Sequence, residues 1–211
     1  MCYSETMSLV AFLLGIAGST LVYTLGAPAD RIIALTMGYI SFIQIIEWLL
    51  WRHPVCDTYH KQISIAGMWI NGLQPVILGV LTLLLSPRTT YKPIVLGIVL
   101  FYLVFALKYC DQYSPGLQCT TQRPKDPHLV WNWLIMPSYQ IMWILFITSV
   151  SLIGIFGMPT LSSGIFIAAS FIVSMITSMI VYPRQDVGSM WCFFAFLISP
   201  TYYMLRINKI L

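Results

Sequence analysis

The sequence predicts an all-α, polytopic integral membrane protein with seven transmembrane helices, folded as a single bundle over residues 1–211. Hydrophobic residues make up 58% of the chain and charged residues only 9%, whereas soluble domains carry about 25% charged residues. Seven stretches are apolar over about the 20 residues that a membrane helix needs. The polar segments between them are too short for a soluble domain, so the lipid bilayer is the expected surrounding.

The boundaries of the seven stretches follow from charge and from helix-breaking residues. Every gap between them contains a charged residue except the one after the fifth stretch, where Gly157-Met158-Pro159 makes the break. The first stretch is expected to be a retained span, because Glu5 and no basic residue precedes it, whereas a signal peptide begins with basic residues. The approximate ranges are 8–26, 32–51, 62–86, 93–109, 129–156, 161–182 and 189–206.

The cysteines indicate which side of the membrane faces outward. With seven spans, Cys2, Cys56, Cys110 and Cys119 fall on the N-terminal side. Disulfides persist mainly in oxidising compartments, so we expect an extracytoplasmic N-terminus and a cytoplasmic C-terminus. Lysines and arginines are divided almost evenly between the two sides and favour neither orientation.

These four cysteines are candidates for disulfides, and Cys110 with Cys119 is one pairing that would pin the long loop 110–128. This loop is polar and rich in proline, which is typical of an irregular surface loop. A metal site built from Cys56, His60 and His128 is the alternative. Structural zinc sites usually contain closely spaced ligand pairs such as C-x2-C, and none occurs here. The sequence therefore favours disulfides or free thiols, and it predicts no cofactor.

Several polar side chains fall inside the predicted spans. They are Gln44, Glu47, Asn71, Gln74, Gln140 and Ser199. Unpaired polar groups are costly in hydrocarbon, so we expect most of these side chains to point into the bundle. At about 1.5 Å rise per residue, the third, fifth and seventh spans place amides or hydroxyls about 13 to 18 Å deep, near the middle of the membrane.

Two interpretations of these polar groups remain open. A proline lies close to the midplane polar group in each of those three spans, and interrupted helices at mid-membrane are typical of transporter binding sites. Glu47 would then lie nearest the outer mouth of a solute or ion path. Asparagine, glutamine and serine also hold membrane helices together by hydrogen bonds. A hydrated cavity would favour the first interpretation, and a dry core the second.

The chain resembles a family of multi-pass membrane proteins over residues 1–85. The residues that carry the resemblance are the opening Met1-Cys2-Tyr3-Ser4, the Gln44-x-x-Glu47-Trp48 segment and the Gln74-Pro75 pair. The family is associated with large DNA viruses of protists and with some microbes. The resemblance implies a membrane protein in which Cys2, Gln44, Glu47 and Gln74 have roles beyond packing, and it implies no activity.

The function that the sequence favours is a small transporter or channel-like protein for a small solute or ion. The alternative is a non-catalytic structural component of a viral envelope or organelle membrane. A thiol- or metal-dependent membrane enzyme is a weaker third interpretation, because none of the usual nucleophile, phosphate-binding or metalloprotease motifs occurs. The diffuse net charge of +4 gives no basic face, so nucleic acid is not an expected partner.

Overall fold

The computed structural model describes residues 4–122, 129–135, 138–181 and 187–211. Over these residues it is all-α apart from one hairpin with two strands of two residues each, which confirms the predicted all-α class. The helices are α1 (Glu5–Thr24), α2 (Pro28–Arg52), α3 (Thr58–Gly72), α4 (Gln74–Leu85), α5 (Lys92–Tyr113), α6 (Tyr139–Gly157), α7 (Leu161–Val181) and α8 (Val187–Ile207). The short elements are the 3-10 helices η1 (Thr89–Tyr91) and η2 (Asn132–Ile135), and the antiparallel strands β1 (Thr121–Gln122) and β2 (Leu129–Val130).

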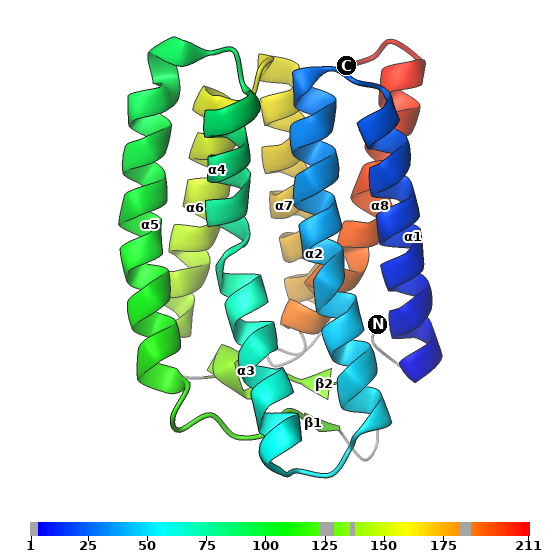
Figure 1. Cartoon of the computed structure of the whole chain (residues 1–211), viewed down its shortest axis with the longest axis vertical. Coiled ribbons are helices and arrows are strands. Elements are labelled where there is room, and N and C mark those ends of the chain that lie inside the picture. The colour runs from blue at the N-terminus through cyan, green and yellow to red at the C-terminus, as the bar shows by residue number, and fades with distance from the viewer. Residues whose placement is uncertain (1–3, 123–128, 136–137, 182–186) are drawn as a thin grey trace.

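The long helices lie side by side and form one bundle with two ends (Figure 1). The β1–β2 hairpin and the start of α3 lie at one end, which we call the hairpin end. The turn between α1 and α2 lies at the other, which we call the opposite end. Helix α1 packs against α2 and α8, α6 packs against α7 and α5, and α3 with α4 packs against α2.

Several helices have the length and composition of membrane spans. Within the described residues, five helices pass this test: α1, α2, α5 with η1, α6 and α7. Helices α3 and α4 pass it together, and would make a sixth span if the bent pair is counted as one. Large apolar side chains such as Leu84, Ile144 and Ile180 are exposed on the outside of the bundle, as lipid contact requires. The count of seven spans stays a prediction.

Local sequence explains where the helices begin. Helices α2, α4 and α5 each have a proline in the first turn, where the missing N–H costs no helical hydrogen bond. The Ser4 side chain caps α1 by accepting a hydrogen bond from Met7 N. The Asp57 side chain caps α3 in the same way, accepting from His60 N at 2.9 Å.

Small residues let the helix backbones approach closely. A Cβ atom added to Gly15 of α1 would overlap Ser41 of α2, and one added to Gly164 of α7 would overlap the backbone of Gly154 in α6. Membrane helices associate through such small residues, since apolar side chains gain little by leaving lipid for each other. These contacts fix the α1–α2 and α6–α7 seams.

A buried carboxylate ties the bundle together at the opposite end. Asp30 at the start of α2 is fully buried. Its Oδ1 atom accepts hydrogen bonds from the Tyr202 hydroxyl at 2.8 Å and from Arg206 Nε at 2.9 Å. Its Oδ2 atom accepts from Ala27 N at 3.1 Å and from Arg206 at 3.3 Å. This network joins the beginning of α2 to the end of α8.

The prediction of one continuous helix over 129–156 is wrong at its N-terminal end. Residues 129–135 form β2 and η2, and α6 begins only at Tyr139. Proline disfavours a helical conformation in the residue before it, and Pro137 falls inside the predicted stretch. The polar loop 110–128 also differs from expectation, because α5 continues to Tyr113 and both Leu117 and Cys119 are buried.

Candidate functional site: a cavity at a broken helix

The third apolar stretch is broken near its middle. Helix α3 ends at Gly72, α4 begins at Gln74, and their axes differ by 45°. Pro75 has no N–H to donate to the carbonyl four residues earlier, so a regular helix cannot continue here without losing a hydrogen bond. The carbonyl four residues before Pro75 belongs to Asn71. The neighbouring Gly72 carbonyl accepts a hydrogen bond of 2.8 Å from the Tyr102 hydroxyl of α5.

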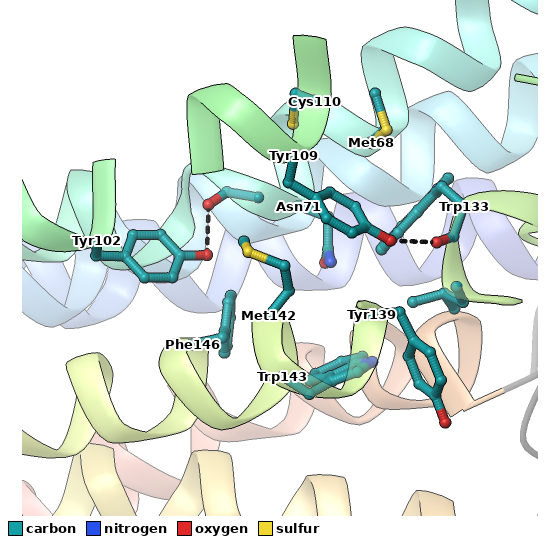
Figure 2. A pocket seen from close by; sticks show the side chains of 12 residues that line it. Met68, Asn71, Tyr102, Tyr109, Cys110, Trp133, Tyr139, Met142, Trp143 and Phe146 are labelled. Carbon is teal, nitrogen blue, oxygen red and sulfur yellow. Dashed lines mark hydrogen bonds between the residues drawn. The ribbon is translucent and has the colours of Figure 1, made fainter. Parts of the chain in front are cut away.

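A small cavity adjoins this break (Figure 2). Its lining comes from α3, α5, η2 and α6 and is largely aromatic, with rings of Tyr102, Tyr109, Trp133, Tyr139, Trp143 and Phe146. The volume is about 30 Å³, compared with roughly 10–15 Å³ for a single water molecule on the same measure. In this structure the cavity therefore accommodates a molecule of only a few atoms.

The polar groups near the cavity are few and uncharged. Among its described lining residues, Asn71 supplies the one side-chain amide, and its Oδ1 atom accepts a hydrogen bond of 3.1 Å from Gln74 Nε2. Gln74 Oε1 and Trp133 Nε1 are buried and have no hydrogen-bond partner within the described structure. Such groups are costly unless they are hydrogen-bonded, so the region favours an occupant that is both donor and acceptor.

Five of the six predicted interior residues are buried, and four of these five lie in α2 or beside the break between α3 and α4. Gln44, Glu47, Asn71 and Gln74 are all 5% exposed or less, but only Asn71 lines the cavity. Glu47 is covered by Trp131, whose indole N–H donates to Glu47 Oε1 at 3.3 Å. The expected position of Glu47 at an open mouth is therefore not what the structure has.

The other two predicted residues lie elsewhere. Gln140 is exposed on the outer face of α6, so the prediction that it points into the bundle is wrong. The hydrophobic period places residues on a common face of a helix but does not say which face turns inward. Ser199 is buried in the seam between α1 and α8, where its hydroxyl lies 3.3 Å from that of Ser19. Ser199 thus joins helices and does not contribute to the cavity.

Two short segments close the hairpin end of the bundle, and we call them the plug: residues 117–122 and 129–134. Trp131 of the plug fits against Gly67 of α3, where an added Cβ would lie 2.5 Å from its ring carbons. The plug residue Thr120 forms a side-chain hydrogen bond of 2.9 Å with Ser64. Tyr109 donates to the Trp133 carbonyl at 2.6 Å. Trp133 and Leu134 form the wall of the cavity at this end.

A disulfide joins the plug to the loop between α2 and α3. It links Cys56 to Cys119, with a Cα–Cα distance of 5.8 Å. The alternative pairing of Cys110 with Cys119 is therefore wrong, and Cys110 is a buried free thiol in the cavity wall. Cys2 lies outside the described residues.

The metal candidates are not brought together as ligands. The sulfur of Cys56 is bonded to Cys119, and the His60 ring nitrogens lie 2.6 and 2.8 Å from the backbone carbonyls of His53 and Thr120. His128 is outside the described part of the chain. Within that part, no group of three or more His, Cys, Asp or Glu residues is placed to hold a metal ion.

Asp57 is the N-cap residue of α3 at the hairpin end. Its carboxylate accepts hydrogen bonds from the His60 backbone N–H and from His53 Nε2 at 2.8 Å. These bonds stabilise the charged form, so they hold the pKa of Asp57 below its ordinary value. The residue thereby orients His60, which lies beneath the plug.

Sequence reasoning missed the aromatic lining and the plug. The segment Val130-Trp131-Asn132-Trp133 follows a polar loop and is apolar enough to pass for the start of a helix. The Asp30–Arg206 pair was also missed. The sequence did contain one signal for this pair. Asp30 precedes the second predicted span and Arg206 ends the seventh, and a seven-helix topology places both residues on the same side of the membrane.

Comparison of the chain with models of protein families, with curated proteins and with solved structures found no match. The resemblance to a virus-associated membrane family therefore stays a prediction.

Proposed function

We propose that this chain crosses the membrane seven times and carries a small solute or ion through the site at the break between α3 and α4. The observation that supports this most directly is the cavity at the break, with Asn71 and Gly72 in its wall. Discontinuous helices near mid-membrane present backbone and side-chain polar groups that a continuous helix would conceal. The structure then corresponds to a closed state.

The chemistry of the cavity favours a particular class of substrate. Its described lining is aromatic and apolar with a single amide, and it offers no charged group to replace the hydration shell of a strongly hydrated ion. A small uncharged solute, able to donate to Asn71 and to accept from Trp133, fits these groups better. We therefore propose a small, weakly hydrated solute as the substrate.

The disulfide supports the proposed orientation. Cys56 and Cys119 lie at the hairpin end, which is also the end where α1 begins. Because disulfides persist in oxidising compartments, we propose that the hairpin end and the N-terminus face the extracytoplasmic side. The Asp30–Arg206 network and the C-terminus then face the cytoplasm.

A flux measurement with two matched amide variants tests this function. The protein is reconstituted in sealed vesicles, and uptake of a panel of small neutral solutes and monovalent ions is measured for the parent chain, for Asn71→Leu and for Gln140→Leu. We expect Asn71→Leu to lower the flux of the transported solute on the order of tenfold, since one lost hydrogen bond of about 1.4 kcal/mol corresponds to that factor. Gln140→Leu, which replaces an exposed amide outside the cavity lining, should leave flux unchanged.

The result that would contradict the proposal is equal flux for the two variants in the presence of measurable parent flux. Glu47→Gln gives a further check on the predicted path. Glu47 is buried beneath Trp131. The Glu47→Gln change should therefore alter flux only when the plug opens.

A non-catalytic structural role is the second candidate, and the tight packing favours it. The cavity is small, and close glycine contacts and buried hydrogen bonds hold the helix seams. In that case the parent chain gives no flux above empty vesicles for any solute in the panel.

A further inference from the structure

The Cys56–Cys119 disulfide is accessible from one side only. Cys56 is exposed, whereas Cys119 is 6% exposed. Both cysteines line a surface hollow of about 440 Å³ at the hairpin end, together with Lys61. A thiol from solution can therefore approach the sulfur of Cys56 more readily than that of Cys119.

Cys119 is also a structural anchor of the plug. Its backbone carbonyl accepts a hydrogen bond from Asn132 of the second plug segment. The next residue, Thr120, donates its N–H to Ser64 Oγ at 3.2 Å, and its carbonyl lies 2.8 Å from His60 Nε2. The covalent bond to Cys56 thus fixes the position of the backbone that these weaker bonds hold.

Movement at Cys119 would be transmitted to the cavity wall. Strand β1 begins two residues after Cys119 and pairs with β2, with Thr121 opposite Val130. Strand β2 leads at once into Trp131, Trp133 and Leu134, the last two of which line the cavity. The two plug segments are therefore coupled, and releasing one weakens the hold on the other.

We propose that the Cys56–Cys119 bond is a thiol-exchange site, at which reduction by an external dithiol releases the plug and opens the cavity. The inference rests on the proposed function in taking this cavity as the solute site. Its chemistry does not depend on the identity of the solute. The chain would then open on reduction and close on oxidation.

The exchange follows the ordinary course of thiol–disulfide chemistry. One thiolate of the dithiol attacks Cys56 Sγ, the Cys56–Cys119 bond breaks, and Cys119 leaves as a thiolate. The Lys61 ammonium donates to the Pro115 carbonyl at 3.2 Å and lines the same hollow, where its positive charge favours the thiolate. The second thiol of the reductant then attacks the mixed disulfide, which forms the oxidised reductant and frees Cys56. Two electrons pass from the dithiol, and its two protons end on the thiols of Cys56 and Cys119.

Cys110 provides a reporter of plug opening. Cys110 is 2% exposed and lines the cavity together with Trp133 and Leu134 of the plug. In a background with Cys2→Ser and Cys192→Ser, the alkylation of Cys110 by N-ethylmaleimide is followed by mass spectrometry of the purified protein. Prior reduction with dithiothreitol, which is removed before labelling because its thiols consume maleimide, should raise the rate on the order of tenfold, since labelling follows the population of the opened form. Adding Cys56→Ser with Cys119→Ser should raise it equally without a reductant.

Thr36→Cys serves as a matched buried control, because Thr36 of α2 is 1% exposed and its hydroxyl has no hydrogen-bond partner to lose within the described structure. Its labelling should not change on reduction. An unchanged rate at Cys110, a disulfide that resists dithiothreitol in the folded protein, or an equal rise at position 36 would each overturn the inference. Because the readout is alkylation, it is independent of whether any solute in the flux panel is transported.

Discussion

Replacement of Trp131 by alanine is expected to lower the free energy of unfolding by about 3–5 kcal/mol, the range found when a large buried aromatic side chain is removed. Trp131 is 1% exposed and fills the space left by the missing side chain of Gly67. The variant also takes away the N–H that donates to Glu47. SDS titration of the helical signal in mixed micelles measures the effect.

Two further variants separate packing from hydrogen bonding. Trp131→Phe keeps a ring against Gly67 but lacks the indole N–H, so we expect a loss of about 1–2 kcal/mol. Trp48→Ala is the matched control, because Trp48 is half-buried and stacks beneath Arg52 at 5.1 Å. It should cost only about 1 kcal/mol. Equal losses for Trp131→Ala and Trp48→Ala would contradict the account of the plug.

Replacement of Arg206 by alanine should give the second large loss, about 2–3 kcal/mol. Removing one partner of a buried ion pair typically costs about 3–5 kcal/mol, because the other charge is left uncompensated. The Arg206 side chain is 31% exposed while that of Asp30 is fully buried, so water screens part of the interaction. Tyr202 and the Ala27 N–H also continue to donate to the carboxylate.

The same SDS titration provides a control for this pair. Arg31→Ala removes an exposed arginine that lies one residue from Asp30 and over the Tyr23 ring, and should cost less than about 1 kcal/mol. Combining Asp30→Asn with Arg206→Ala should cost less than the sum of the single changes by about 1 kcal/mol or more. Additive losses would indicate that the two side chains act independently.

The sequence predicts the helices well where apolar length alone determines them. The stretches 8–26, 32–51, 93–109 and 161–182 each fall within or along a helix of the structure, because a long apolar segment has few alternatives to a helix in lipid. Gln74-Pro75 also marks the break between α3 and α4 correctly. The same reasoning fails for residues 129–135, because their apolar character reflects burial inside the bundle and not contact with lipid.

The site depends on contacts that sequence spacing cannot reveal. Cys56 and Cys119 are 63 residues apart, and cysteine spacing does not determine which pairs form. Gln140 has the same side chain as Gln74, yet one is exposed and the other is buried. The difference lies in how each helix is rotated in the bundle, and packing against neighbouring helices sets that rotation.

We propose that α3 and α4 together cross the membrane, so that the break and its cavity lie within the bilayer. Their 45° bend keeps the two helices running in the same general direction (Figure 1). Thr58 at the start of α3 and Thr90 after α4 are both exposed. Thr58→Cys and Thr90→Cys, each in the Cys2→Ser, Cys192→Ser background, can be labelled in sealed vesicles with a membrane-impermeant maleimide. We expect the two positions to react from opposite sides of the membrane, and reaction of both from the same side would make α3 and α4 a re-entrant loop and contradict the account.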